Sequence, residues 1–403
     1  MMKPRILFVD DNKNILMGLR RMLRGQRDAW DMDFAEGGED ALAKLEAAAA
    51  DVVVTDMKMP GMSGAELLDQ VSALYPRSLR LILSGEADPE ATFRTIATSH
   101  QFLQKPSNTE RLVDIIKASL ELRGAIPGAE RQAWVTGAHR LAVSRAGCER
   151  LRPLLEQDSL PIEETAEVFA AEPALAAKVM QLANSAYFGV GDPVASPKAA
   201  VALLGQDVLR ALLREETLLP PCPEGLCQSH YERAVALSRD VGELAAWIAG
   251  QQGAGETAIA HAQLAGLLHG LGRLLLCNQA PQDYAKVLAL VSAGARVEDA
   301  ERETFGSSQA DFGAYLAQIW GLPQVVVDAL RLLERPSAGE VSEELATPLL
   351  AAHSALGIVT GINAPEPRTA AAAHLDGDFL VQQNCEGEIG DWVEGWLKRE
   401  TAA

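Results

Sequence analysis

The first 122 residues alternate between short apolar runs and segments with helical spacing. The segments between the runs place apolar residues three or four positions apart, which is the spacing of an amphipathic helix. The run VVVT at 52–55 does not alternate with polar residues, as expected for a strand covered on both faces. Repeated alternation of this kind predicts a doubly wound α/β domain with a five-stranded parallel sheet. The expected strands cover 5–9, 32–35, 52–55, 79–83 and 101–103, and the expected helices cover 14–24, 38–48, 64–74, 89–98 and 108–123.

Polar side chains follow the carboxyl ends of four of these strands. They are Asp10 and Asp11, Asp56, Ser84 and Lys105. In an open α/β sheet these ends share one edge, where ligands bind. Three carboxylates gathered there repel one another unless a cation neutralises them, and oxygen ligands of this kind suit Mg²⁺. A hydroxyl and an ammonium group would complete a site for phosphoryl oxygens, so we expect Asp56 to be a nucleophile that forms an aspartyl phosphate.

Four spaced motifs agree with such a site. They are FVDD at 8–11, TDMKMPGMSG at 55–64, LSG at 83–85 and LQKP at 103–106. With these motifs, residues 4 to about 122 resemble the receiver domain of bacterial two-component response regulators, which has a flavodoxin-like fold.

The resemblance implies roles for individual residues of this region. Asp56 would be the phosphoacceptor, phosphorylated by a cognate histidine kinase, and Lys105 and Ser84 would assist the transfer. Mg²⁺ would be held by Asp11 and Asp56, with Asp10 close by. The remaining implied residues are the backbone carbonyl of Lys58 as a further metal ligand and a switch pair formed by Ser84 and Phe102.

The rest of the chain is expected to be helical. Almost every segment beyond Cys148 has helical periodicity. Aromatic residues make up only 5% of the chain and alanine is abundant, a composition that favours many closely packed helices. Gly124, Pro127 and Gly128 end the helix expected over 108–123.

Two stretches of this helical part resemble an HDOD domain, a relative of the HD phosphohydrolases. One is 171–213, which contains the signatures EPALAAKV and ANSA, and the other combines 264–276 with 303–323. We therefore expect an all-α HDOD domain in the second part of the chain. The predicted organisation is a receiver domain at 1–122, a helical linker at 123–145, the HDOD domain at 146–345 and its helical extension at 346–403.

The metal ligands of an active HD enzyme are mostly replaced in this sequence. Such an enzyme needs adjacent His and Asp on one helix and further His and Asp ligands from other helices. Here His269 is followed by Gly270, whose side chain cannot bind a metal. We therefore predict a degenerate HD site that takes no cofactor, with His269 as a buried or interface histidine. The other histidine positions of the family fall on Leu237 or Ser238, on Gln309 and on Leu332–Leu333.

Two weaker metal sites stay open as alternatives. His261 lies about two helical turns before His269, so a pair on one helix face is conceivable. Cys222, Cys227 and His230 place three soft ligands within nine residues, as some zinc sites do. The favoured interpretation of this second segment is an ordinary loop.

The charge balance bears on which partners the chain can have. Acidic residues outnumber basic ones by 55 to 36, which gives a formal net charge of −19. This disfavours binding to nucleic acid and docking on an anionic membrane. Five scattered cysteines, a short apolar run at the N-terminus and the lack of an apolar stretch of 18 residues indicate a cytoplasmic protein.

The leading functional hypothesis is a response regulator with a non-enzymatic output. Phosphorylation of Asp56 would switch the receiver and thereby an HDOD surface that acts on an unknown protein partner. A homodimer through the face around 88–122 is also expected. The alternatives are a metal-dependent phosphohydrolase, such as a cyclic-dinucleotide phosphodiesterase, and a DNA-binding transcriptional regulator.

Overall fold

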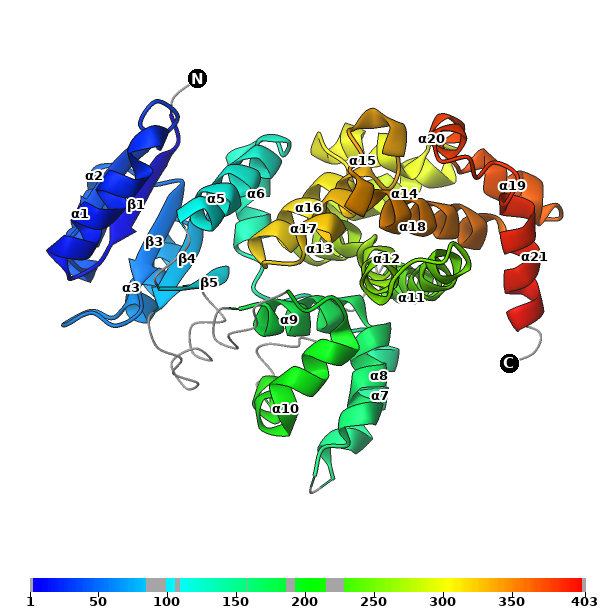
Figure 1. Cartoon of the computed structure of the whole chain (residues 1–403), viewed down its shortest axis with the longest axis horizontal. Helices are drawn as coiled ribbons and strands as arrows, with labels where there is room; N and C mark the ends of the chain where they lie inside the picture. The colour runs from blue at the N-terminus through cyan, green and yellow to red at the C-terminus, as the bar shows by residue number, and fades with distance from the viewer. Residues whose placement is uncertain are drawn as a thin grey trace. The chain divides into compact units, whose positions relative to one another are not determined.

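The chain divides into two compact units (Figure 1). The computed structural model describes residues 3–84, 99–105, 109–157, 159–185, 193–214 and 228–400. The first unit consists of Met1–Arg140, Gln181–Pro193 and Gln318–Gly321, and the second of Leu141–Met180, Val194–Ala317 and Leu322–Ala403. No helix within the described ranges is both long enough and apolar enough to cross a membrane.

A five-stranded parallel sheet forms the core of the first unit, as the sequence predicts. Its order is β2-β1-β3-β4-β5, so the winding direction reverses between β1 and β3. Ile6, Phe8 and Val54 are almost fully buried, because helices cover both faces of the sheet. The strands are β1 Arg5–Val9, β2 Asp31–Ala35, β3 Val52–Asp56, β4 Leu79–Ser84 and β5 Gln101–Gln104.

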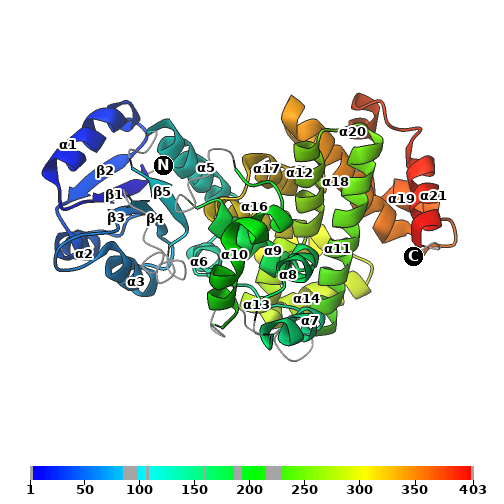
Figure 2. The same cartoon turned by 60° about the horizontal axis from the view of Figure 1, so that its bottom comes forward.

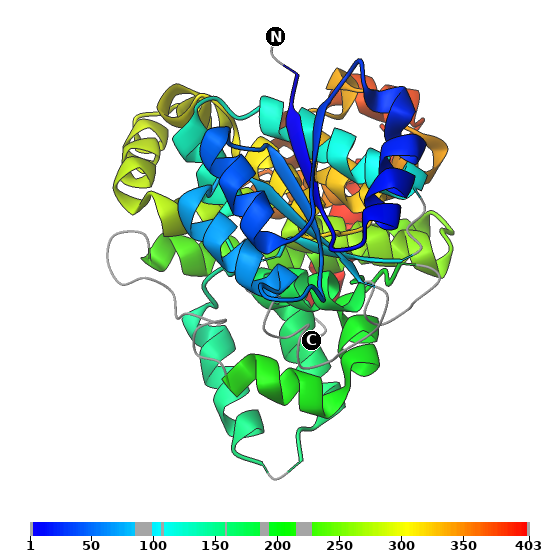
Figure 3. The same ribbon diagram turned by 90° about the vertical axis from the view of Figure 1, so that its left-hand side faces the viewer.

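Helices lie on both sides of this sheet. α2 and α3 cover one face and α1 and α5 the other (Figure 2), and Figure 3 shows the same layers from another side. The helix predicted over 89–98 lies outside the described residues. The helices are α1 Lys13–Met22, α2 Gly38–Ala47, α3 Gly64–Leu74 and α5 Thr109–Gly124, with a short 3₁₀ turn, η1, at Leu23–Gln26.

The turn after β3 depends on the glycine at position 64. Gly64 N donates to the carbonyl oxygen of Met57 at 3.0 Å, and a Cβ atom here would overlap the backbone carbonyl of Asp56. Ser63 caps α3 in a capping box with Glu66, so the helix begins immediately at this close approach. Only glycine leaves room for the two backbone segments.

A buried arginine and histidine hold helix α6 (Ala129–Thr136) within the first unit. Arg80 N donates to His100 Nδ1 at 2.9 Å, which fixes the imidazole proton on Nε2. His100 Nε2 and an Arg80 guanidinium nitrogen then both donate to the Thr136 carbonyl oxygen, at 2.8 and 2.6 Å. The chain that follows α5 is thus anchored to the sheet as far as the end of α6.

The second unit is mostly helical in its described residues, in agreement with the sequence. Helices α11, α12 and α18 pack against one another in it. α11 and α12 approach closely, because a Cβ atom at Gly266 would lie 2.8 Å from the Val241 carbonyl oxygen. The helices are α7 Arg145–Leu155, α8 Ile162–Ala171, α9 Pro173–Ala183, α10 Pro197–Arg214, α11 Gln228–Gln251, α12 Glu256–Leu268, α13 Leu271–Gln279, α14 Pro281–Ser292, α15 Val297–Phe305, α16 Gln309–Ile319, α17 Gln324–Leu332, η3 Pro336–Ala338, α18 Glu343–Gly361, α19 Pro367–Ala373, α20 Gly377–Gln382 and α21 Ile389–Glu400.

A buried histidine ties the C-terminal helices to the rest of the second unit. His353 Nε2 accepts from Asp376 N and its Nδ1 donates to the Leu333 carbonyl oxygen, both at 2.8 Å. The Asp376 carboxylate in turn accepts from Ser337 N and Oγ, at 3.0 and 2.6 Å. Because Nε2 accepts a hydrogen bond, the imidazole carries its proton on Nδ1, and burial is the main cause that lowers the pKa of His353.

We expect Gly64→Ala to destabilise the first unit by about 2–3 kcal/mol, because the new methyl group forces the backbone of Asp56 to move. The matched control is Gly18→Ala in α1, where nothing lies within 4 Å of the added carbon. That substitution should stabilise the helix by about 0.5–1 kcal/mol. Urea denaturation of the full chain measures both. Equal unfolding midpoints for the two variants would show that the backbone at Asp56 leaves room for a methyl group at position 64.

The second unit should lose stability as the pH falls below the ordinary histidine value of 6.5. The folded pKa of His353 is depressed, so the unfolded chain takes up a proton first and folding weakens as the pH drops toward the folded pKa. In His353→Gln the side chain still offers a donor and an acceptor but does not titrate, so this pH dependence should diminish. The exposed His374→Gln is the control. Urea midpoints between pH 5 and 8 test this, and an unchanged slope in His353→Gln contradicts it.

Candidate functional site

Three of the residues singled out in the sequence meet at one edge of the sheet. Asp10 directly follows β1, Asp56 is the last residue of β3, and Lys105 directly follows β5. Lys105 Nζ lies 2.6 Å from Asp10 Oδ2 and 2.7 Å from Asp56 Oδ1. Because β1 and β3 are neighbours in the sheet, their carboxyl ends bring the two aspartates together at the point where the winding reverses.

The two carboxylates differ in how far solvent reaches them. The Asp10 side chain is 3% exposed and that of Asp56 is 14% exposed. Asp10 Oδ1 also accepts from Asn12 N at 2.9 Å, so both oxygens of this inner carboxylate are engaged. The Lys105 ammonium group donates to Asp56 Oδ1 and makes no hydrogen bond to Asp56 Oδ2. Asp56 is therefore the more accessible of the two carboxylates.

The lysine between them stays charged. Burial, the largest single cause, lowers the pKa of Lys105, but the hydrogen bonds and charges of Asp10 and Asp56 together outweigh it. The pKa of Lys105 is consequently raised above its ordinary value. A permanently positive group thus joins two carboxylates that would otherwise repel each other.

The other predicted residues of this edge are placed as follows. Asp11 and Lys58 are exposed, whereas Phe102 is buried on β5. Ser84 ends β4, and its side chain lies outside the described part of the structure. No group of three or more His, Cys, Asp or Glu side chains in the described ranges is arranged as a metal site. The chemistry of two aspartates at a sheet edge nevertheless fits a hard cation such as Mg²⁺, because Asp56 Oδ2 is not taken by the lysine.

The predicted degenerate HD site lies where α12 ends and α13 begins. His269 is buried, and its Nδ1 lies 2.7 Å from the Gly266 carbonyl oxygen. Burial lowers the pKa of His269 to about 4, and the charge of Arg273 lowers it further against the opposing effect of that carbonyl. A Cβ atom at Gly270 would lie 3.1 Å from Ser238 Oγ. Leu237 and Ser238 are the two candidates for one of the replaced histidine positions, and of these two the serine is the one beside Gly270.

Gln309, the second replaced position, belongs to a buried polar cluster. Its backbone N donates to Glu301 Oε2 at 2.9 Å, and its Nε2 donates to Glu334 Oε1 at 2.8 Å. Tyr284 OH donates to Glu301 Oε1 at 3.1 Å, and Arg273 Nε lies 3.8 Å from the same oxygen. Leu333 is buried, and Leu332 lines a neighbouring cavity.

Four residues of this cluster are absent from the sequence-based site. Arg273 could have been predicted from the sequence, because it lies about one helical turn after His269 and Gly270. Glu301, Glu334 and Tyr284 come from other parts of the chain and carry no local pattern. Of the weaker metal alternatives, His261 is partly buried on α12, His230 lies on α11, and Cys222 and Cys227 fall outside the described residues.

Family comparisons match both halves of the chain. The model described as "Response regulator receiver domain" matches residues 6–117, and the model described as "HDOD domain" matches residues 146–336. These ranges contain, respectively, the aspartate–lysine edge and the cluster around His269 and Gln309.

The matches to individual relatives cover only part of the length of each relative. The hydrogenase transcriptional regulatory protein HoxA of Cupriavidus necator is 29% identical over 121 residues, which is 30% of this chain and 24% of that protein. The DNA-binding transcriptional regulator NtrC of Salmonella typhimurium is 27% identical over 121 residues, again 30% of this chain and 25% of that protein. The chain thus spans about a quarter of the length of these relatives.

Solved structures resemble the chain over longer or shorter parts. The MmoQ response regulator from Methylococcus capsulatus is 25% identical, with a TM-score of 0.45 over 60% of this chain and 97% of that one. The signal receiver domain of an HD domain-containing protein from Pseudomonas fluorescens is 28% identical, with a TM-score of 0.29 over 30% of this chain and 96% of that one. The two family matches carry the assignment: the chain is a response regulator in which a receiver domain is followed by an HDOD domain.

Proposed function

We propose that Asp56 accepts a phosphoryl group from a cognate histidine kinase in the cytoplasm and thereby switches the receiver domain. The observation that supports this is the Lys105 ammonium group, held between Asp10 Oδ2 and Asp56 Oδ1 at 2.6 and 2.7 Å. Asp56 is also the carboxylate that solvent reaches more easily, so a phosphoryl donor can approach it.

In the proposed reaction an oxygen of Asp56 attacks the phosphorus of the donor. The new P–O bond forms as the bond from phosphorus to the donor atom breaks, and the leaving group keeps that electron pair and takes up a proton. Lys105 stabilises the charge on the phosphoryl oxygens in the transition state. Bound Mg²⁺ would supply further charge stabilisation, and its proposed ligands are Asp11 and Asp56, with Asp10 nearby, and the backbone carbonyl of Lys58.

The proposed switch follows from the charge change at Asp56. The carboxylate carries one negative charge, whereas the aspartyl phosphate carries close to two on oxygens that lie farther from the strand end. Lys105 then has a stronger partner than Asp56 Oδ1 and moves toward it. Ser84 and the buried Phe102, on β4 and β5, are the residues proposed to reorient with it. The predicted dimer face at 88–122 includes 88–98 and 106–108, which lie outside the described residues.

Acetyl phosphate with Mg²⁺ should add one phosphoryl group to the wild-type chain and none to Asp56→Asn. Asp69→Asn, an exposed carboxylate on α3, is the matched control and should react like the wild type. Lys105→Met should react more slowly by roughly a hundredfold, because it removes the charge that faces the phosphoryl oxygens. Intact-mass spectrometry measures the added group. Equal labelling of Asp56→Asn and the wild type would refute Asp56 as the acceptor.

We further propose that the HDOD domain is a non-catalytic output that acts on a protein partner. Three observations support this: the His269 ring is buried against a backbone carbonyl, Gly270 contributes no ligand, and Gln309 donates to Glu334. A guanidinium group, that of Arg273, also lies in this cluster and opposes the approach of a metal cation. The acidic surface charge favours a protein partner over DNA.

Three measurements on the full chain test this output. Elemental analysis should find no transition metal retained after gel filtration, whereas two tightly bound metals per chain would favour a phosphohydrolase. A pull-down that compares beryllofluoride-treated wild type with Asp56→Asn should recover a protein that differs between the two samples. Identical recovery from both would contradict a phosphorylation-dependent output. A salt-dependent complex with DNA at nanomolar affinity would favour the transcriptional alternative.

A further inference from the structure

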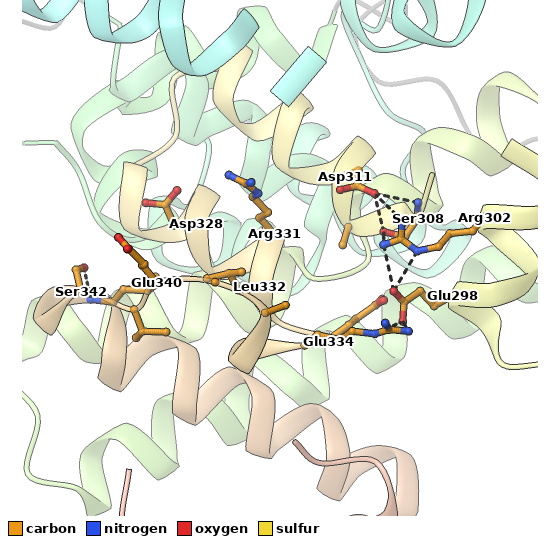
Figure 4. Close-up of a pocket in the computed structure, with 16 residues that line it drawn as sticks. Glu298, Arg302, Ser308, Asp311, Asp328, Arg331, Leu332, Glu334, Glu340 and Ser342 are labelled. Carbon is orange, nitrogen blue, oxygen red and sulfur yellow. Dashed lines mark hydrogen bonds and ion pairs between the residues drawn. The ribbon is translucent and has the colours of Figure 1, made fainter. Parts of the chain in front are cut away.

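A cavity of about 630 Å³ opens beside helix α17 in the second unit (Figure 4). Its volume falls within the range of small-molecule sites in proteins. Five acidic and three basic side chains line it, so the lining carries a formal excess of two negative charges. These side chains are Glu298, Asp311, Asp328, Glu334, Glu340, Arg302, Arg331 and Arg335. The charge of the lining is therefore complementary to a ligand with two positive charges.

Two of the arginines are paired with carboxylates of the same lining. Arg302 and Arg335 each lie 3.1 Å from an oxygen of Glu298. Arg302 Nη1 also lies 3.7 Å from Asp311 Oδ2. The third arginine, Arg331, is exposed near the end of α17. One wall of the cavity is thus balanced within the protein, and Arg302 and Arg335 leave the other carboxylates of the lining without their charge.

Two glutamates of the lining, Glu334 and Glu340, form no ion pair with a described residue. Glu334 Oε1 accepts from Gln309 Nε2 at 2.8 Å, whereas Glu340 accepts no hydrogen bond from the described residues. Burial, the largest cause, raises the pKa of Glu334 against the opposing effects of the Gln309 hydrogen bond and the charge of Arg273. A cation in direct contact would stabilise a carboxylate in such surroundings. The two glutamates equal in number the two excess charges of the lining.

An apolar wall separates these two carboxylates. Leu332 lies between Glu334 and Glu340 in Figure 4. A Cβ atom at Gly339 would lie 2.6 Å from Leu332 Cδ2, so the chain directly before Glu340 packs on this leucine. Leu345, which is almost fully buried, also lines the cavity. The cavity thus has an acidic group on each side of a surface on which methylene groups can pack.

We propose that this cavity binds a linear alkyl diamine, with one ammonium group at Glu334 and the other at Glu340. Each ammonium group would donate to carboxylate oxygens, and the methylene chain between them would lie along Leu332. A ligand with one ammonium group would leave one of the glutamates without a cation, and an anion would be repelled by the excess negative charge. The site lies within the second unit and does not use Asp56.

Isothermal titration calorimetry of the full chain at low ionic strength tests this. The probes are two diamines, putrescine and cadaverine, and the monoamines with the same chains, butylamine and pentylamine. The wild type should bind at least one diamine saturably, and the matched monoamine at least about tenfold more weakly, because a monoamine lacks one charge-assisted contact. Butylamine also represents a lysine side chain, so equal affinity for a diamine and its monoamine would favour a single ammonium group of a protein partner instead.

Substitutions assign the binding to the two glutamates. Glu334→Gln should weaken diamine binding by about 10- to 100-fold, because it removes the charge of a partly buried acceptor. Glu340→Gln should weaken binding by about three- to fivefold, because this carboxylate is exposed. Glu340 has no partner among the described residues, so its variant keeps the test decisive if Glu334→Gln fails to fold. The matched control is Glu303→Gln on α15, an exposed glutamate outside the lining, which should bind like the wild type.

Three results would overturn the proposal. One is the absence of saturable binding of either diamine by the wild type, and another is equal affinity for a diamine and its matched monoamine. The third is an equal loss of affinity in Glu340→Gln and Glu303→Gln, which would indicate general attraction of a dication to a chain with a net charge of −19. Asp56→Asn should bind the diamine like the wild type, so failure here is distinguishable from failure of the proposed phosphoacceptor.

Discussion

The ion pairs of Lys105 with Asp10 and Asp56 are the interaction on which the receiver edge depends. They join the ends of β1, β3 and β5, and the two aspartates would repel each other without the shared cation. The same ion pairs leave Asp56 as the accessible carboxylate, since Asp10 also binds Asn12 N. One ammonium group thus holds the strand ends together and leaves one carboxylate open to solvent.

The candidate site of the second unit also contains a cationic side chain, that of Arg273, but its contacts with carboxylates differ from those of Lys105. Lys105 has two carboxylate oxygens within hydrogen-bond distance, whereas Arg273 lies 3.8 Å from Glu301 Oε1, which also accepts a hydrogen bond from Tyr284. Lys105 donates to both carboxylates at 2.6 and 2.7 Å. Arg273 instead forms a longer ion pair with Glu301, and its Nε is buried without a hydrogen-bond partner.

The sequence predicts the receiver edge well because that site is encoded locally. Asp10, Asp56 and Lys105 each follow the end of a predicted strand, and parallel topology alone brings such ends together. The polar cluster of the second unit is different, since Glu301, Glu334 and Tyr284 lie on helices whose packing no periodicity specifies. Even the choice between Leu237 and Ser238 needed the rotation of α11, which places the serine beside Gly270. Side chains that meet only through helix packing leave no signature in a single sequence.

The anchoring of α6 suggests a physical path from the proposed switch residues toward the following chain. Arg80 lies four residues before Ser84 on β4, and His100 lies two residues before Phe102. Both anchors bind the Thr136 carbonyl at the end of α6. The buried guanidinium group and the neutral imidazole restrict movement of the Thr136 carbonyl, because each has a single favourable geometry for its donors. A shift of β4 against β5 that accompanies reorientation of Ser84 and Phe102 would therefore strain these two hydrogen bonds, and α6 would have to follow or detach.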